Sequence, residues 1–283
     1  MNPTGPLADA RLFKHEAMHT IFMLRLREVA DDSAPGIARQ CIELLEKLES
    51  QLSRFIEDSD ISRINHMRAG ETLYLSEDTW QCLLLALDAH TRTAGLFDIT
   101  IGSRIEHAKS GADSPLPEIS GALTIHPDVP AVTCTEPGRQ LDLGGIGKGF
   151  ALDQLKLLLA DWGVEDALIG AGASSMLAIG PTGWPVELTG AAEAQRISLC
   201  NQALSASGSG IQGAHIVHPY GEEAMPAIAC SRVWVTAPTA ALAEIWSTAL
   251  MLIAADEIPA LIASDPQVMG VQVEVGGQVR TIR

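Results

Sequence analysis

The spacing of apolar residues changes from two to three and four within the first 55 residues, so this chain must combine strands with helices. Between residues 18 and 29 apolar and polar side chains alternate, which predicts a strand with one buried face. Over residues 37–55 the apolar side chains instead form one stripe along a helix, which Ser33 and Pro35 introduce.

The rest of the chain repeats this mixture. Ser76 followed by two acidic residues is typical of a helix N-cap, and the apolar face that follows ends at Gly95. Further elements are predicted as a helix after residue 150 that Gly163 closes, strands at 167–169 and 232–236, a helix at about 240–254, and a final hairpin of VQVEV and QVRTIR joined by GG. Helices mixed with antiparallel hairpins favour an α+β fold with largely antiparallel sheets over a regular βαβ array.

Residues that break regular structure gather in the middle of the chain. Residues 109–117, and the prolines at 127, 130 and 137, predict loops around short strands. We expect one domain over residues 1–283, whose candidate subdomain boundary lies near 109–137.

Composition excludes several classes of partner. The chain has 19 Lys and Arg against 35 Asp and Glu, a formal net charge of −16, so we expect no binding of nucleic acid or anionic lipid. No apolar run approaches the ~20 residues of a membrane span, so we expect no transmembrane segment. Because residues 1–13 lack the basic and apolar stretches of an export signal, we expect a cytoplasmic protein, or a periplasmic or exported one if a signal was trimmed ahead of Met1.

The segment LDLGGIGKGF, residues 141–150, places four glycines, Asp142 and Lys148 at a strand-to-helix junction. Glycine lets backbone amides approach an oxyanion, and the helix N-terminus and Lys148 add positive charge. A Walker A loop needs Gly where Asp142 stands and Ser or Thr where Gly149 stands, and a dinucleotide fingerprint needs Gly where Phe150 stands. Taken alone, the segment is typical of an anion-binding loop or of a turn with tight helix packing.

His15, Glu16 and His19 spell HEAMH, which matches the HExxH zinc signature of metallopeptidases. That signature requires a helix, whereas these residues run into the alternating stretch, where positions four apart lie more than ~12 Å from each other. A zinc metallopeptidase is therefore only a remote alternative.

Two further groups of polar residues are candidates for chemistry. A second loop of small residues leads to His215, which is either a general base near neutral pH or a structural histidine. Glu244 and Thr248 lie four apart on a predicted helix, so a carboxylate and a hydroxyl face the same way. Oxygen ligands suit magnesium, but the pair alone is equally a helix packing detail, and a third oxygen is needed.

Taken in order, these segments resemble the ApbE-like FAD:protein FMN transferases, which move FMN from FAD onto a Thr or Ser of another protein. The pieces that carry the resemblance are AMHT, LSRFIEDSDISRIN, GLFDITIG, LDLGGIGKGFALD, GSGIQGAHIVHP and AEIWSTAL. The glycine-rich piece with its trailing ALD is the most specific of them. The resemblance covers most of the chain and implies an ApbE-like, T-fold-related α+β architecture.

The resemblance also implies which residues form the site. Those that would line the FAD pocket or contact FAD are Met18, Phe55, Leu96, Phe97, Asp98, Asp142, Lys148 and Ile216. Those that would hold magnesium are Gly145, through its carbonyl, Glu244 and Thr248. His215 would be the catalytic base.

The implied reaction is magnesium-dependent transfer of FMN from FAD to a Thr or Ser hydroxyl of an acceptor protein, with release of AMP. Without water exclusion the same site would hydrolyse FAD to FMN and AMP. The chain departs from the family pattern at three positions: Glu244 replaces Asp, His19 replaces Gly, and His218 replaces an acidic or amide residue. These departures leave a second interpretation open, an FAD-binding relative with weak or no transferase activity.

Overall fold

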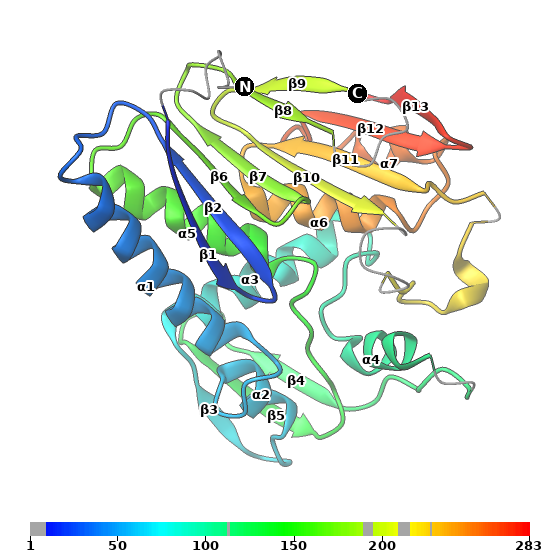
Figure 1. The fold of residues 1–283 in the computed structure, drawn as a ribbon. Coiled ribbons are helices and arrows are strands. Elements are labelled where there is room, and N and C mark those ends of the chain that lie inside the picture. The colour runs from blue at the N-terminus through cyan, green and yellow to red at the C-terminus, as the bar shows by residue number, and fades with distance from the viewer. Residues whose placement is uncertain (1–9, 112–113, 189–194, 209–215, 227) are drawn as a thin grey trace.

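The computed structural model describes residues 10–111, 114–188, 195–208, 216–226 and 228–283, and its central feature is an eight-stranded antiparallel sheet (Figure 1). In spatial order the strands are β1 (Arg11–Ala17), β2 (Thr20–Leu26), β6 (Ala167–Ala171), β7 (Ser175–Ile179), β10 (Ala203–Gly208), β11 (Arg232–Ala237), β12 (Gly270–Val275) and β13 (Gln278–Thr281). Every neighbouring pair is antiparallel, which confirms the predicted fold class.

The first and last hairpins of this sheet turn through left-handed residues, as two-residue turns between twisted strands require. Gly276 and Gly277 have φ values of 59° and 77° and confirm the predicted C-terminal hairpin. Met18 and His19 have φ values of 50° and 57° and reverse the chain between β1 and β2. The strand predicted over residues 18–29 therefore begins only at Thr20.

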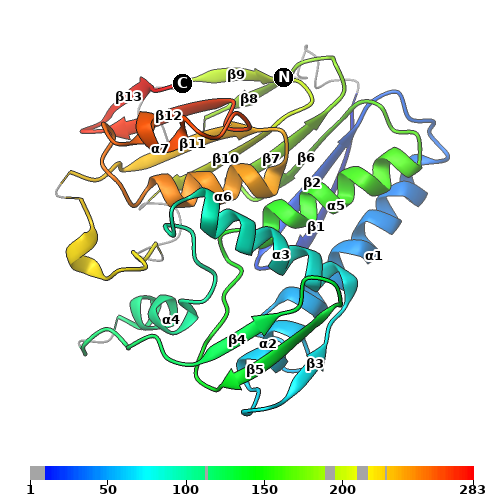
Figure 2. The same ribbon diagram turned by 180° about the vertical axis from the view of Figure 1, so that it is seen from behind.

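Helices cover one face of the sheet, and Figure 2 shows α5 and α6 in front of it. The helices are α1 (Ala34–Leu52), α2 (Asp60–Asn65), α3 (Glu77–Arg92), α4 (Gly102–Ser110), α5 (Gly147–Asp161), α6 (Ala240–Leu250) and α7 (Ile258–Ile262), with a short 3₁₀ turn at Glu222–Ala224. Ten of the eleven residues of α6 are buried, and only Thr248 is partly exposed. A helix this deeply buried needs a specific reason for each polar side chain that it carries.

The predicted helices are confirmed with small shifts at their ends. Ser76 caps α3 by accepting a hydrogen bond from the Thr79 amide. α1 ends at Leu52, before Phe55, and α6 ends at Leu250 rather than near residue 254. Among the described residues, no helix combines the length and apolar character needed to cross a bilayer.

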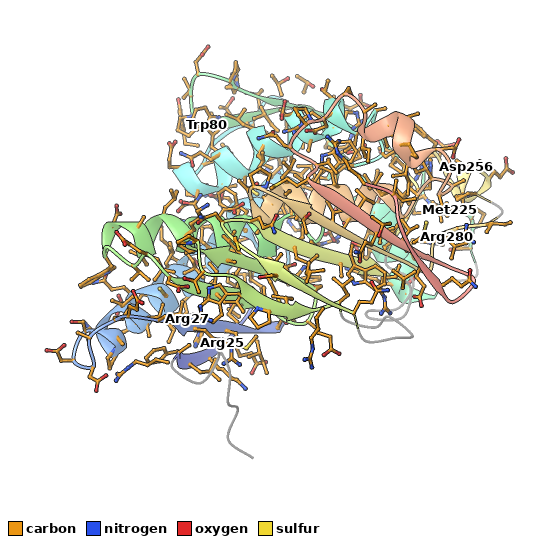
Figure 3. All side chains as sticks on the ribbon, turned by 90° about the horizontal axis from the view of Figure 1, so that it is seen from above. Arg25, Arg27, Trp80, Met225, Asp256 and Arg280 are labelled. Atoms are coloured by element: carbon orange, nitrogen blue, oxygen red, sulfur yellow. The ribbon has the colours of Figure 1, made fainter. Side chains whose placement is uncertain are left out.

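The other face of the sheet is covered by a short hairpin of β8 (Trp184–Glu187) and β9 (Arg196–Leu199). The guanidinium carbon of Arg27 lies 3.4 Å from the ring centroid of Trp184. Asp166 accepts hydrogen bonds from both, at 3.3 Å from Arg27 and 2.8 Å from Trp184. Arg27 lies at the β1–β2 end of the sheet, as Figure 3 shows. Its buried guanidinium charge is compensated by the ion pair with Asp166 and by the ring of Trp184.

A small three-stranded sheet lies apart from the large one (Figure 1). Its order is β3 (Thr72–Tyr74), β5 (Ala131–Glu136) and β4 (Ala122–Ile125). These are the short strands between loops that the breaker residues predict. A subdomain boundary near residues 109–137 stays a prediction.

Candidate functional site

The HEAMH sequence does not form a zinc site. His15 and Glu16 lie in β1 and His19 lies in the turn that follows, so the two histidines are not one helical turn apart. His15 instead places Nε2 3.3 Å from Oε1 of Glu46 on α1. In the part of the chain that the structure describes, no group of three His, Cys, Asp or Glu side chains could hold a metal ion. The zinc metallopeptidase alternative is therefore wrong.

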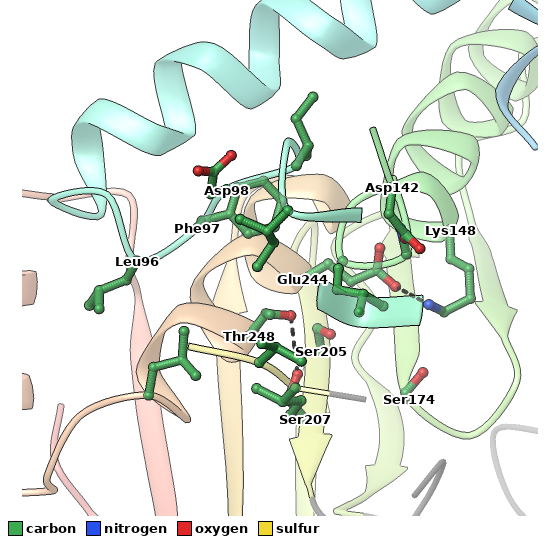
Figure 4. A pocket seen from close by; sticks show the side chains of 18 of the residues that line it. Leu96, Phe97, Asp98, Asp142, Lys148, Ser174, Ser205, Ser207, Glu244 and Thr248 are labelled. Atoms are coloured by element: carbon green, nitrogen blue, oxygen red, sulfur yellow. Dashed lines mark hydrogen bonds and ion pairs between the residues drawn. The ribbon is translucent and has the colours of Figure 1, made fainter. Parts of the chain in front are cut away.

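Two cavities meet at the glycine-rich segment. The first, of about 130 Å³, is lined by residues 96–99, the end of β10 and α6, and Figure 4 shows it from close by. The second, of about 470 Å³, is lined by the β1–β2 turn and the end of α1. Four residues line both cavities and are called the junction residues below: Lys109, Asp142, Gly144 and Lys148.

The structure gathers the predicted site residues around these two cavities. Those on the first cavity are Leu96, Phe97, Asp98, Asp142, Gly145, Lys148, Ile216, Glu244 and Thr248. Those on the second are Met18, Phe55, Asp142 and Lys148. His215 lies outside the described residues. Segments from the first to the last third of the chain therefore converge on one region, while the role of each residue stays a prediction.

Glu244 is held in place by three donors from other elements. The Gly149 amide donates to Oε2 at 2.8 Å, and the Ser175 hydroxyl donates to Oε1 at 2.8 Å. The Lys148 ammonium lies 2.9 Å from Oε1, and Figure 4 marks this ion pair. Glu244 is only 4% exposed, and these hydrogen bonds and the ion pair replace the hydration that its carboxylate loses on burial.

The close contact between α5 and α6 brings Glu244 to this position. A Cβ on Gly149 would lie 2.5 Å from the Ala240 carbonyl oxygen, so only glycine allows the two helices to approach this far. Asp153 of α5 accepts hydrogen bonds from the amides of Ala240 at 2.8 Å and Ala241 at 2.9 Å, which caps α6. Burial raises the pKa of Asp153 to about 6, although these amides and Lys156 act to lower it.

Gly145, Glu244 and Thr248, the three residues predicted to hold magnesium, all line the first cavity. A Cβ on Gly145 would lie 3.5 Å from Oγ1 of Thr248, so the backbone of Gly145 lies against that hydroxyl. Thr248 is one helical turn from Glu244 on α6, and its Oγ1 is 3.5 Å from Oγ of Ser207 (Figure 4). A carbonyl, a carboxylate and a hydroxyl are donors that magnesium accepts. The chemistry of these three groups is compatible with a magnesium ion, although Oε1 of Glu244 is paired with Lys148 here.

Asp142 at the junction is surrounded by positive charge. Nη1 of Arg54 lies 3.1 Å and Nζ of Lys109 4.0 Å from its Oδ2, and the Gly144 amide donates to its Oδ1 at 2.7 Å. Arg54 also pairs with Glu106 at 2.8 Å. Sequence reasoning missed Arg54, although it lies within LSRFIEDSDISRIN, and Lys109, which lies outside every motif, because a single basic residue carries no signal of where its side chain lies.

The second cavity has an aromatic wall. The rings of His19 and Phe55 meet edge to face, with centroids 5.6 Å apart and an interplanar angle of 74°. The Met18 amide donates to Oε1 of Glu49 at 2.8 Å, which ties the β1–β2 turn to α1. Phe55 is 69% exposed, so its ring can stack on a planar ligand. His19 occupies a left-handed turn position, which glycine adopts without strain, and it adds a ring to the cavity wall.

His218 is another of the departures noted in the sequence, and its contacts show what the histidine does there. Its Nδ1 accepts a hydrogen bond from the Tyr220 amide at 3.1 Å, a role that an acidic or amide oxygen also performs. Burial lowers its pKa, which favours the neutral ring that this hydrogen bond requires. The replacement therefore keeps an acceptor ahead of Pro219.

Fold and site together define an α+β protein with a two-part cleft, cationic at its junction and carrying oxygen donors on one side. A family model described as "ApbE family" matches residues 18–273, and the chain belongs to this family. The predicted resemblance is thereby confirmed.

Curated relatives and solved structures agree with this assignment. Two relatives named FAD:protein FMN transferase, both from Klebsiella pneumoniae strain 342, are 26% and 23% identical to this chain. The first match covers 59% of this chain and 56% of the relative, and the second covers 89% and 81%. The chain thus spans little more than half of the first relative in that match. The flavin transferase ApbE from Vibrio cholerae has a TM-score of 0.79 at 18% identity over 96% of both chains, which confirms the ApbE fold. These relatives are transferases, as the sequence predicts for this chain.

Proposed function

We propose that this chain transfers FMN from FAD to a Thr or Ser hydroxyl of an acceptor protein, releasing AMP, with magnesium at the site. The observation that supports this best is the convergence of residues from Met18 to Thr248 on two adjoining cavities. FAD consists of two ring systems joined through a diphosphate, so an elongated site with a cationic middle suits it.

The charges around the cavities support a role for a divalent cation. The described charged residues that line them are the cations Arg54, Lys109 and Lys148 and the carboxylates Glu49, Asp98, Asp142 and Glu244. Carboxylates outnumber cations, so the lining alone would not neutralise a diphosphate. A magnesium ion held by Gly145, Glu244 and Thr248 would supply the missing positive charge and stabilise the charge that develops on the phosphate during transfer.

The chain's own residues divide the remaining work. Met18 and Phe55 bind one ring system of FAD in the second cavity. Residues 96–98 and Ile216 contact FAD from the first cavity. Lys148, already beside Glu244, adds positive charge at the phosphates.

His215 takes the proton of the acceptor hydroxyl as its oxygen bonds to the phosphorus of FMN. The bond from that phosphorus to the bridging oxygen breaks, and AMP leaves with the electron pair.

A second candidate is an FAD-binding protein with weak or no transferase activity. The observation that favours it is the set of three donors on Glu244, because Oε1 must exchange Lys148 for the metal ion. A Glu in the place of the family's Asp is also one methylene longer, and magnesium tolerates little error in its coordination distances.

To test the proposal, the purified chain is incubated with FAD, magnesium and a protein that serves as acceptor for one of the Klebsiella relatives. We expect AMP by chromatography and covalent FMN on the acceptor by in-gel fluorescence. His215→Ala should abolish both products while FAD affinity, measured by flavin fluorescence, stays within about twofold, because the base acts only in the chemical step.

The other outcomes separate the candidates. FAD binding without AMP selects the FAD-binding alternative, and FMN and AMP without modified acceptor select FAD hydrolysis. Wild-type protein that binds no FAD would exclude all three functions.

A further inference from the structure

The geometry points to Lys109 as a residue that binds the diphosphate of FAD, an inference that rests on the proposed function. Lys109 belongs to none of the segments that carry the family resemblance, and no role follows for it from them. It is nevertheless one of the four junction residues, and with Lys148 one of the two that are cationic.

A ligand with a ring system in each cavity must pass its linker along the junction residues. In FAD this linker is a diphosphate, which carries two negative charges. Asp142 would repel it, Gly144 offers only backbone, and the two lysines attract it. Lys148 already pairs with Glu244 at 2.9 Å, so the charge of Lys109 is the less committed of the two.

The contacts of Lys109 leave its ammonium available. Its Nζ lies 4.0 Å from Oδ2 of Asp142, which is beyond hydrogen-bond distance, and this is its one ion pair within the described residues. The Asp142 carboxylate is already paired with Arg54 at 3.1 Å and with the Gly144 amide at 2.7 Å. Lys109 is thus held near the junction by a carboxylate that other groups largely neutralise, and its N–H donors remain for phosphate oxygens.

The first turn of α4, the helix that carries Lys109, is anchored to three other segments of the chain. Nη1 of Arg54 donates to the Gly102 carbonyl at 3.2 Å, at the start of α4. Arg104 donates to the carbonyls of Pro117 at 3.1 Å and Pro219 at 2.6 Å. These contacts fix the position from which the long Lys109 side chain reaches the junction.

The experiment compares dissociation constants of three probes, FAD, ADP and riboflavin, for wild type, Lys109→Gln, Lys109→Arg and Lys14→Gln. Lys109 has a 47% exposed side chain, so its replacement should leave the fold intact, which thermal denaturation checks. Lys14 is an exposed lysine on β1 that lines neither cavity and serves as the matched control.

Lys109→Gln removes one charge-assisted hydrogen bond, so its dissociation constants for FAD and ADP should rise about 10-fold. Riboflavin, which lacks phosphate, should bind unchanged, Lys109→Arg should stay within about threefold of wild type, and Lys14→Gln should match it. The dependence of log Kd for FAD on log salt concentration should also become shallower in Lys109→Gln.

Unchanged FAD affinity in Lys109→Gln would overturn this inference, and so would an equal loss of FAD and riboflavin, which indicates a structural role. In both cases wild-type FAD binding, and with it the proposed function, would stand. Wild-type protein that binds no FAD would overturn both.

Discussion

Single polar side chains decide the local geometry of this site because they lie in apolar surroundings. Glu244 is the one charged residue of the buried helix α6, and its carboxylate accepts from Gly149, Ser175 and Lys148. Asp153 caps the same helix from α5, and burial raises its pKa to about 6. Each residue positions an element through its hydrogen bonds, because a buried polar group without a partner costs free energy.

Asp153 should make the stability of the protein depend on pH. Its folded-state pKa of about 6 lies above the ordinary value of 3.8, so the folded state binds the proton more tightly. The proton on Asp153 therefore contributes to the free energy of unfolding in full below about pH 4, and this contribution is lost as the pH rises through 6. Relative to wild type, Asp153→Asn, which carries no charge, should therefore gain up to about 3 kcal/mol in free energy of unfolding between pH 4 and pH 7.

Urea unfolding at pH 4, 5, 6 and 7 measures this difference. Asp161→Asn, the same substitution at the exposed end of α5, is the matched control. A difference between Asp153→Asn and wild type that is constant over this range would contradict the assignment.

The contact between α5 and α6 is the element-scale feature on which the site depends. Gly149 lets the first turn of α5 approach the start of α6, and the same glycine amide donates to Glu244. The buried apolar residues of both helices belong to the main core beneath the large sheet. The contact at Gly149 therefore determines both the packing of the two helices and the geometry of the site.

Gly149→Ala should force these helices apart. The added methyl would meet the Ala240 carbonyl at 2.5 Å, and we expect overpacking to lower the free energy of unfolding by about 1–3 kcal/mol. FAD affinity should fall as well, because the hydrogen bond from residue 149 to Glu244 lengthens.

Gly36→Ala is the matched control for this substitution, since Gly36 lies in α1 with nothing within 4 Å of an added Cβ. It should raise the free energy of unfolding by roughly 0.5–1 kcal/mol, as alanine does in a helix. Equal effects of both substitutions in urea unfolding would argue against the close approach.

At the scale of the whole molecule, the two cavities join parts of the chain that are distant in sequence. Residues 18–20, Glu49 and residues 52–55 line the second cavity, and residues 96–99 and α6 line the first. A ligand that fills both would tie these parts together. Its binding free energy would then add to the stability of the entire fold.

FAD with magnesium should therefore raise the melting temperature. At about 100 times the dissociation constant, ligand linkage gives about 2.7 kcal/mol, which for a chain of this length corresponds to roughly 4–5 °C. Differential scanning calorimetry with and without EDTA measures this, with riboflavin as the control ligand. A shift with FAD that EDTA leaves unchanged would show that no metal ion contributes to binding.

Local patterns were sufficient to predict much of this protein. The apolar stripe of α1, the Ser76 cap of α3 and the Gly276–Gly277 hairpin depend on residues close together in sequence, so spacing and residue type predict them. The ordered motifs identified the family, and they named the residues that the two cavities bring together.

Contacts between distant residues could not be predicted in this way. The approach of Gly149 to Ala240, the hydrogen bond from Ser175 to Glu244, and the pairing of Arg54 and Lys109 with Asp142 each join separate elements. Such contacts depend on strand order and helix packing, which bury apolar surface in one common core. Hydrophobic burial has no direction of its own, so the partner of each polar side chain emerges only when the packed core places the elements beside one another.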